Sequence, residues 1–380
     1  MTSISTVLPT YATVNLAALA HNLSRIRHYL SPGCEVMAIV KANAYGHGAV
    51  ECAQALTRQG IGRFAVASLD EGIELRQAGL AAPIVVLGAL FEEQIVDLVA
   101  HRLTPVVSDE RILPVLAKAA HSHPTPYPIH LKAETGMGRL GFSPKELSRL
   151  LDNPVLRNPL QVEGVMTHLA DADGTDTAFT ERQLGAFHAI LEQVRQRGLT
   201  VPLVHTANSA AIVRFPEAHF SLVRPGIMLY GYHTLPTSVP APDLTPVLSL
   251  RTTIVQLRTI PQGGTVSYNR TFVAKRPTRI AILPIGYADG YSRKLSNRGS
   301  VLIQGHRAPI VGLVCMDMIM VDVTDIESVQ VGETVTLIGQ QGGASIWADE
   351  IADWIGTIPY EVLCGIGPRV PRLYESAAQD

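Results

Sequence analysis

The lysine at position 41 stands where an apolar run of the sequence ends. Five consecutive apolar residues, Val36–Val40, precede Lys41, and a turn that contains Gly46 and Gly48 follows it. Such a run is typical of a parallel strand covered on both faces, so we expect the Lys41 amine to be only partly solvated. Desolvation lowers the pKa of a lysine amine, and a neutral amine can form a Schiff base with a carbonyl compound. The alternative is a lysine that extends its ammonium group into solvent, and the run alone does not separate the two.

Other cationic and imidazole side chains also stand at the ends of expected strands. Each one alone has a structural interpretation of similar weight, and a single buried histidine is more often a satisfied core residue. Together, such groups repel one another unless an anion or an acidic partner binds among them. The residues are Lys41, Lys132, Arg139, His168, His205 and Arg224, and Asn208 and Ser209 follow His205 closely.

The turn Arg224-Pro225-Gly226-Ile227 is a second indication of an anion site. Glycine at the start of a short loop lets backbone N–H groups approach a phosphate closely. The loops after the seventh and eighth strands of a (β/α)₈ barrel are the usual phosphate site, and Ser209 is placed to donate its hydroxyl there. An ordinary Pro-Gly turn is the structural alternative. A Schiff-base lysine and a phosphate site in one barrel predict pyridoxal phosphate as cofactor.

The first two thirds of the chain alternate expected strands with helical patterns. Eight such strands favour a (β/α)₈ TIM-type barrel. In such a barrel, the cationic and imidazole side chains at the strand ends would meet at one mouth. A short strand at Tyr11–Val14 and a helix capped by Asn15 come first, so we place the barrel domain at residues 10–235. The eight strands are expected at Val36–Lys41, Arg63–Ser68, Ile84–Gly88, Pro105–Ser108, Pro128–Lys132, Val162–His168, Leu203–Thr206 and Leu222–Arg224.

The composition changes after residue 234. The stretch Thr234–Pro242 is rich in proline and is typical of a linker. Beyond it, short β-branched runs punctuated by glycine predict a mostly β C-terminal domain over residues 243–380. One helix, near Trp347–Ile355, is expected within it.

Charge and cysteine content exclude several classes of protein. Lys plus Arg number 31 against 33 for Asp plus Glu, without long runs of one sign, which argues against nucleic-acid and membrane partners. The N-terminus lacks a signal-peptide pattern and no apolar run is long enough to span a bilayer, so we expect a soluble cytoplasmic protein. Four scattered cysteines without C-x-x-C spacing predict neither a disulfide framework nor a zinc site.

Eight motifs, in order along the chain, resemble those of the alanine racemase family. Together they span nearly the whole sequence, which is far more specific than any one of them. The motifs are Val40–Gly48, Lys132–Phe142, His205–Ala210, Val223–Gly231, Val266–Tyr268, Gly286–Tyr291, Val314–Asp317 and Ile358–Glu361.

The resemblance implies two catalytic bases for a pyridoxal-phosphate enzyme. Lys41 resembles the lysine that carries the cofactor as a Schiff base and then acts as one base. Tyr268 resembles the second base, which reaches the opposite face of the cofactor from the partner subunit of a homodimer. Arg224 resembles the arginine that donates a hydrogen bond to the pyridine nitrogen, and His168 the histidine beside the ring.

The resemblance also implies the remaining contacts. Lys132 corresponds to a lysine often found carbamylated and paired with Arg139, which with the Met316 backbone would hold the substrate carboxylate. Tyr287 resembles a residue near the site entrance. The phosphate-binding set is Tyr45, Ser209, Gly226, Ile227 and Tyr360; Asn208 joins the cofactor-binding set, and Cys315 and Asp317 join the substrate-binding set.

The implied activity is interconversion of L-alanine and D-alanine, which would supply D-alanine for peptidoglycan or serve alanine catabolism. Two departures from the family pattern are Met166, where many relatives have tyrosine, and Asn269, where glycine is commoner. A broader racemase, for serine or other amino acids, is an alternative. A fold-related decarboxylase would need an acidic residue at the pyridine nitrogen, and Arg224 argues against it. A non-enzymatic cofactor carrier would not need a β domain that bears Tyr268.

Overall fold

The computed structural model describes residues 8–121 and 123–375 and divides the chain into two compact units. The barrel unit comprises Leu19–Ala44 and Ala49–Thr245. Among the described residues, the β unit comprises 8–18, 45–48 and 246–375. The chain therefore passes between the two units several times.

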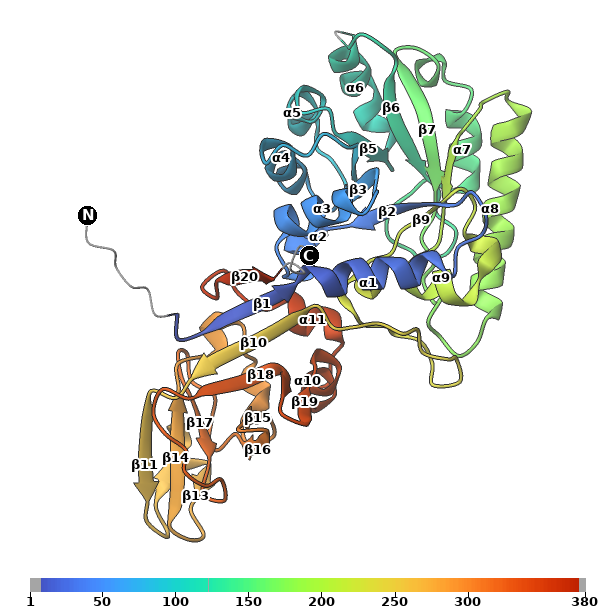
Figure 1. Cartoon of the computed structure of the whole chain (residues 1–380). Coiled ribbons are helices and arrows are strands. Elements are labelled where there is room, and N and C mark those ends of the chain that lie inside the picture. The colour runs from blue at the N-terminus through green and yellow to red at the C-terminus, as the bar shows by residue number, and fades with distance from the viewer. Residues whose placement is uncertain (1–7, 122, 376–380) are drawn as a thin grey trace, which may run out of the picture. The chain divides into compact units, whose positions relative to one another are not determined.

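Eight parallel strands form the sheet of the barrel unit, in the order β8-β7-β6-β5-β4-β3-β2-β9 (Figure 1). Hydrogen bonds from Ser221 N to Val204 O (3.2 Å) and from Arg224 N to Ala207 O (2.9 Å) join its two ends, so the barrel is nearly closed. The expected barrel is confirmed. The strands are β2 Glu35–Ile39, β3 Arg63–Val66, β4 Ile84–Val86, β5 Thr104–Val107, β6 Tyr127–Lys132, β7 Leu160–Met166, β8 Leu203–His205 and β9 Leu222–Val223.

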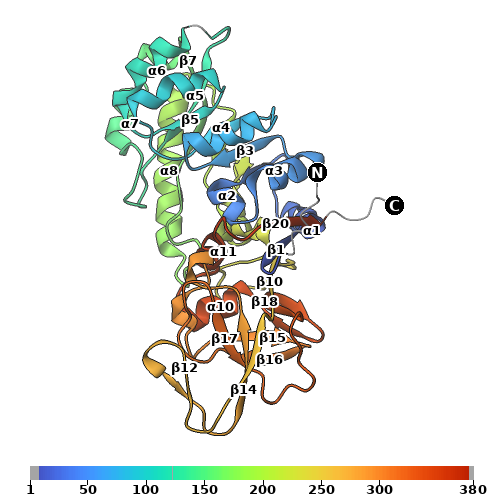
Figure 2. The same cartoon turned by 90° about the vertical axis from the view of Figure 1, so that its left-hand side faces the viewer.

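Helices cover the outer side of this sheet (Figures 1 and 2). Several begin at the signals that the sequence carries: Ser68 and Glu71 form a capping box at the start of α4, and Ser143 and Glu146 do so at α7. Their inward faces pack aliphatic side chains against the strands. The helices are α1 Leu16–Arg27, α3 Ala49–Arg58, α4 Leu69–Gln77, α5 Ile95–Ala100, α6 Leu113–Ala120, α7 Pro144–Leu150, α8 Ala178–Gln196 and α9 Ser209–Arg214.

The β unit contains a seven-stranded sheet, a three-stranded sheet and a two-stranded ribbon. The large sheet has the order β16-β15-β18-β10-β1-β20, and β19 pairs with β18. The mostly β character of this part is confirmed. Its strands are β1 Tyr11–Asn15, β10 Leu248–Thr253, β11 Gln256–Ile260, β12 Thr265–Val266, β13 Phe272–Val273, β14 Thr278–Leu283, β15 Ser300–Ile303, β16 His306–Pro309, β17 Ile319–Asp322, β18 Thr334–Gln341, β19 Ala344–Ile346 and β20 Arg372–Glu375.

The structure differs from the sequence expectation at β1. The sequence favours a place for Tyr11–Val14 in the barrel domain, but β1 pairs antiparallel with β10 and parallel with β20. The physical reason is that the barrel already contains eight strands and is nearly closed, which leaves no sheet edge for a ninth. In the β unit, by contrast, β1 hydrogen-bonds along both of its edges and its central residues are buried.

Helix content in the β unit is also higher than expected. The helix near Trp347–Ile355 is present as α10 (Ala348–Ile355), and a second helix, α11 (Pro359–Cys364), follows it. With only six residues, α11 is too short for a clear helical period in the sequence. The sequence does not predict strand β11, because all five of its residues are exposed or half-buried and show no apolar alternation.

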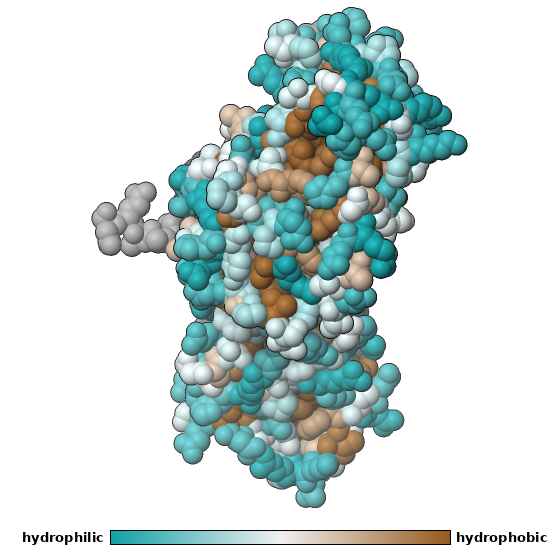
Figure 3. Space-filling view, turned by 90° about the vertical axis from the view of Figure 1, so that its right-hand side faces the viewer, coloured by the Kyte–Doolittle hydropathy of each residue, from teal (hydrophilic) through white to brown (hydrophobic). Residues whose placement is uncertain are grey.

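The described residues contain no helix long and apolar enough to cross a membrane. The face shown in Figure 3 is a mixture of hydrophilic residues and separate apolar patches.

Candidate active site

Lys41 begins a left-handed turn directly after the first barrel strand. The short element α2 (Lys41–Tyr45) has φ and ψ near +50° at Ala42, Asn43 and Ala44, and φ is 54° at Tyr45. Left-handed backbone costs roughly 1–2 kcal/mol per residue for L-amino acids, so four such residues in succession need firm support. The sequence predicts a turn here but not its left-handed conformation.

Three hydrogen bonds hold the turn within the barrel unit. Ala42 N donates to Glu71 Oε1 (2.6 Å), and Ala44 N donates to Val40 O (2.8 Å). The Asn43 side-chain oxygen accepts from Ala49 N (2.8 Å), at the start of α3. These contacts fix the backbone on both sides of the turn, and they thereby fix the direction in which the half-buried Lys41 side chain leaves the strand.

Cationic groups gather around Lys41 in the barrel unit. Lys132 ends β6 and is 5% exposed, and its pKa is lowered to about 8 by burial, with smaller contributions from Arg139, Arg224 and Lys41. Burial and the same cations lower the pKa of His168 to about 3. The predicted mouth residues therefore do lie close enough to act on one another. Such a cluster is electrostatically unfavourable until an anion enters it.

Arg224 is held by hydrogen bonds to two histidines and to the backbone. It follows β9, is 4% exposed, and burial lowers its pKa to about 9. Its Nη1 donates to His205 Nδ1 (3.0 Å), and its Nη2 is shared among His168 Nδ1 (3.2 Å), Thr167 O and Thr206 O (both 2.9 Å). Among the described residues, none accepts from Nε or from the second Nη1 hydrogen. Arg224 is therefore fixed in place while two of its donors remain available to a ligand.

The loop after β9 has the features expected of a phosphate site. Ser209 Oγ accepts from Gly226 N (3.0 Å) and Met228 N (3.4 Å), which leaves its hydroxyl hydrogen for another acceptor. Asn208 caps α9 through a hydrogen bond from Ala211 N (3.0 Å), so its side-chain oxygen is engaged in the helix. Ile227 is fully buried at the start of a 3₁₀ turn, Ile227–Tyr230. Ser209 and Gly226 thus lie together, in the segments after β8 and β9.

The donor set of the barrel unit fits a phosphorylated cofactor and an anionic substrate. Lys41, Lys132, Arg139 and Arg224 supply positive charge, and Ser209 supplies a hydroxyl. Glu134 is the acidic group that acts on Lys132, but it also accepts backbone N–H groups of Gly136 and Arg139. Within residues 8–121 and 123–375, no group of three or more His, Cys, Asp and Glu side chains is arranged to hold a metal ion.

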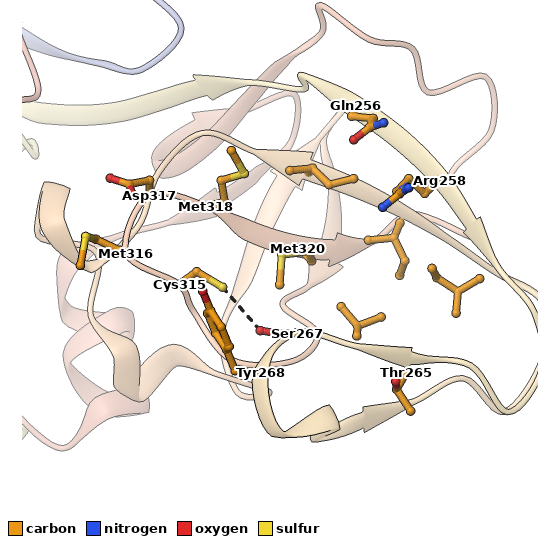
Figure 4. Close-up of a pocket in the computed structure, with 14 residues that line it drawn as sticks. Gln256, Arg258, Thr265, Ser267, Tyr268, Cys315, Met316, Asp317, Met318 and Met320 are labelled. Carbon is orange, nitrogen blue, oxygen red and sulfur yellow. Dashed lines mark hydrogen bonds between the residues drawn. The ribbon is translucent and has the colours of Figure 1, made fainter.

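In the β unit, four of the predicted site residues line one cavity of about 590 Å³ (Figure 4). They are Tyr268, Cys315, Met316 and Asp317. Tyr268 is 68% exposed and follows Ser267, whose hydroxyl donates to Leu313 O (2.7 Å) and lies 3.5 Å from the Cys315 sulfur. The loops that carry Tyr268 and Met316 are therefore tied together.

Two details explain the local sequence in this cavity wall. Gly286 lies so close to the Met316 loop that an added Cβ would come within 2.2 Å of Met316 O, and the next two residues, Tyr287 and Ala288, donate to Cys315 O and Met316 O. Asn269 has φ 57° and ψ 5°, a region that asparagine tolerates better than most residues, which accounts for asparagine where glycine is commoner.

Tyr45 and Tyr360 contact each other in the β unit, with ring centroids 5.7 Å apart. Tyr45 is buried at 6% exposure, and Tyr360 is half-buried at the start of α11. The other departure, Met166, is 2% exposed and ends β7 between Lys132 and His205 in the register of the sheet.

Sequence reasoning missed Glu71 and His130. Glu71 is the fourth residue of a Ser-x-x-Glu capping box, a signal that is visible in the sequence, although its reach to Ala42 is not. His130 precedes Lys132 by two residues, so the alternation of a strand places both side chains on the inner face of the barrel.

The fold and the site together define a (β/α)₈-barrel protein with a lysine at the end of its first strand, a cluster of cationic side chains around that lysine and an additional β unit. Residues 14–234 match the family model "Alanine racemase, N-terminal domain", and residues 247–374 match "Alanine racemase, C-terminal domain". Alanine racemase of Carboxydothermus hydrogenoformans is 46% identical over 367 residues, which cover 96% of this chain and 99% of that protein.

Solved structures agree. Alanine racemase of Clostridium difficile 630 has a TM-score of 0.93 at 33% identity and covers 99% of this chain and 98% of its own. That of Bacillus anthracis with bound L-Ala-P has a TM-score of 0.90 at 37% identity, with 97% and 95% covered. That of Bartonella henselae with covalently bound pyridoxal phosphate has a TM-score of 0.87 at 32% identity, with 97% and 99% covered. The chain belongs to the alanine racemase family, whose members are isomerases.

Proposed function

We propose that this protein interconverts L-alanine and D-alanine with pyridoxal phosphate as cofactor. The observation that carries the proposal is the group of cations around Lys41 in the barrel unit, in which Arg224 keeps two donors and Ser209 one hydroxyl for a ligand. Related structures, one with covalently bound pyridoxal phosphate and one with bound L-Ala-P, support the same cofactor and substrate class.

The protein's own groups would hold and orient the cofactor. Ser209, Gly226 and Ile227, with Tyr45 and Tyr360, are proposed to bind its phosphate, and His168 and Asn208 to flank the site. Arg224 would donate a hydrogen bond to the pyridine nitrogen. Because arginine keeps its proton in that hydrogen bond, the pyridine nitrogen stays unprotonated. An unprotonated ring withdraws fewer electrons from the substrate, which limits side reactions. When bound, the cofactor supplies an aldehyde for the amino group and a ring that accepts the electron pair of the breaking Cα–H bond.

Two bases are proposed to exchange the Cα proton. Racemisation needs proton removal on one face of the substrate and proton delivery on the other, so each base serves alternately as acid and base. Lys41 Nζ would serve one face and the Tyr268 hydroxyl the other. Arg139 and the Met316 backbone would hold the carboxylate, while Cys315, Asp317 and Tyr287 shape the site.

Lys132 is a candidate for carbamylation. Burial lowers its pKa to about 8, so a neutral amine is available near neutral pH. Its nitrogen can form a bond to the carbon of CO₂ and release one proton to solvent. The resulting carbamate would carry a negative charge next to Arg139. The repulsion between the Lys132 ammonium group and Arg139 would then become an attraction between the carbamate and Arg139.

The proposal includes a homodimer in which Tyr268 of one subunit serves the Lys41 site of the other. It includes a cytoplasmic location and a role in supplying D-alanine for peptidoglycan or in alanine catabolism. Initial rates in both directions on a panel of L- and D-amino acids test the substrate, and we expect alanine to give the highest kcat/KM. A higher value for serine or another amino acid would replace alanine as the substrate.

Solvent exchange tests the two bases. We expect the Tyr268→Phe variant to lose exchange of the Cα proton of one alanine enantiomer and to keep partial exchange of the other, because Lys41 remains. Equal losses for both enantiomers would argue against separate faces. NMR of alanine recovered from D₂O, with the wild-type protein as reference, measures both rates.

A further inference from the structure

A line of polar side chains crosses the interior of the barrel below Arg224. His205 on β8 and His130 on β6 are both fully buried, and His205 Nε2 lies 2.8 Å from His130 Nδ1. The other nitrogen of His130, Nε2, lies 3.4 Å from Oε2 of Glu163 on β7. Glu163 Oε1 in turn accepts from Arg63 Nη1 (3.2 Å), at the first residue of β3. The line thus runs from the mouth of the barrel to its opposite end.

The position of the His130 ring is built into the sheet. Gly164 on β7 is the register partner of His130, and an added Cβ at Gly164 would lie 2.6 Å from Cγ and Nδ1 of that ring. Any other residue at position 164 would therefore displace His130. Among the described residues, Nε2 of His130 makes no hydrogen bond of good geometry. The Glu163 carboxylate, 3.4 Å away, is within reach of it as an acceptor.

The donor-only character of arginine sets the direction of every hydrogen bond in this line. Arg224 Nη1 must donate, so Nδ1 of His205 accepts and the His205 proton is on Nε2. That proton is donated to Nδ1 of His130, so the proton of His130 is also on Nε2 and faces the Glu163 carboxylate. Burial lowers the pKa of both histidines, which keeps them neutral, and the contact with His130 lowers the pKa of the Glu163 carboxyl.

We propose that His130 and Glu163 are positioning residues for the cofactor-binding arginine: they fix the tautomer of His205, so that Arg224 always meets an acceptor at Nη1. With the opposite tautomer, N–H groups of Arg224 and His205 would face each other, and the guanidinium would leave the position set by its hydrogen bonds to His205, His168 and the backbone. The tautomers of His130 and His205 follow from contacts within the protein and do not depend on a ligand. Their effect on a ligand rests on the proposed function, with pyridoxal phosphate as that ligand.

The first test uses the wild-type protein without cofactor. Nitrogen-15 NMR of histidine-labelled protein distinguishes the two neutral tautomers and the charged form by their chemical shifts. We expect both His130 and His205 to be neutral with the proton on Nε2, with resonances assigned from His130→Asn and His205→Asn variants. A proton on Nδ1 of either ring, or a charged ring, overturns the proposal whatever the activity of the protein.

The second test changes the end of the line. Glutamine at position 163 keeps the shape of glutamate but has only one oxygen, so Arg63 and His130 compete for it. We expect Glu163→Gln to give a mixture of tautomers at His205 and to weaken binding of pyridoxal phosphate to apoprotein about tenfold, as loss of one hydrogen bond to a charged group would.

Glu35→Gln is the matched control, because Glu35 Oε2 also lies near Arg63 (3.5 Å to Nε), whereas the carboxylate near His130 is that of Glu163. We expect it to leave tautomers and affinity unchanged. Equal losses in both variants would assign the effect to Arg63 and the fold, and unchanged affinity in Glu163→Gln would remove the positioning role. Failure of the wild-type protein to bind pyridoxal phosphate would instead refute the proposed function and leave the tautomer result standing.

Discussion

Glu71 Oε1 accepts a hydrogen bond of 2.6 Å from Ala42 N, the first residue after Lys41. The other carboxylate oxygen, Oε2, accepts from Ala67 N (2.7 Å) and Ser68 N (3.3 Å) at the start of α4. One side chain therefore joins the cap of a barrel helix to the strained turn that begins at the candidate catalytic lysine. The arrangement uses a common helix-capping device to support backbone that is unfavourable by itself.

We predict that Glu71→Gln lowers the free energy of unfolding by about 1–2 kcal/mol, because glutamine has one acceptor oxygen where the structure uses two. The attachment of pyridoxal phosphate to Lys41 should also slow, since the turn is less firmly held. Urea unfolding and absorbance after mixing with cofactor measure the two effects. Glu74→Gln, at an exposed position of the same helix, is the control. If both variants behave alike, Glu71 contributes nothing beyond its charge.

Borohydride reduction of the protein loaded with pyridoxal phosphate should attach the cofactor to Lys41. Lys41 leaves the end of the first barrel strand beside Arg224 and Lys132, where a phosphorylated aldehyde would be attracted. Peptide mapping by mass spectrometry identifies the labelled lysine. Lys41→Ala should abolish the label, whereas Lys118→Ala, at an exposed site on α6, should not. Labelling of Lys132 in the wild-type protein would show that the assignment of the two lysines is wrong.

Stability should depend on pH through Lys132. Its pKa is about 8 in the folded protein against 10.5 normally, so between these values the folded protein binds fewer protons than the unfolded chain. The free energy of unfolding therefore rises with pH in this window. In CO₂-free buffer, we expect Lys132→Met to increase it by about 1–3 kcal/mol at pH 7 and to have little effect above pH 10.5. Urea unfolding at a series of pH values measures this, with Lys118→Met as the exposed control.

If Lys132 is carbamylated, it should stabilise the protein in the presence of bicarbonate, whereas the free amine lowers the free energy of unfolding. A carbamate on Lys132 would be attracted by Arg139 and Arg224, so bicarbonate should stabilise the wild-type protein and leave Lys132→Met unchanged. Intact mass measured under neutral conditions would show the added group directly. A stability that does not respond to bicarbonate would mean that Lys132 functions as an amine.

Complementation tests whether the site is shared between subunits. Neither Lys41→Ala nor Tyr268→Phe protein should be active alone. When equal amounts exchange subunits at random, half of the dimers are mixed and one of the two sites in each is intact, so about a quarter of the wild-type activity should return. Exchange is verified by differently tagged chains. No recovery after verified exchange would place Lys41 and Tyr268 of each site on the same chain.

The sequence alone determined the features that depend on short-range pattern. The apolar run Val36–Val40, and the alternation of eight short strand-like segments with helical patterns, predict the parallel strands of a barrel. The same pattern places Lys41 at the end of the first expected strand and Gly226 in the turn after the last one. The motifs then identified the family, and through it the residues of the β unit that no periodicity singled out.

Only the tertiary structure decided features that depend on distant residues. The pairing of His130 with His205 joins positions 75 residues apart, and Glu163 reaches the same line from a third strand. The left-handed turn at Ala42 exists because Glu71, 29 residues away, supports a conformation that its own residue types disfavour. Strand β1 lies in the β unit because the barrel offers no open edge. In each case local preference is weak or unfavourable, and long-range hydrogen bonds determine the outcome.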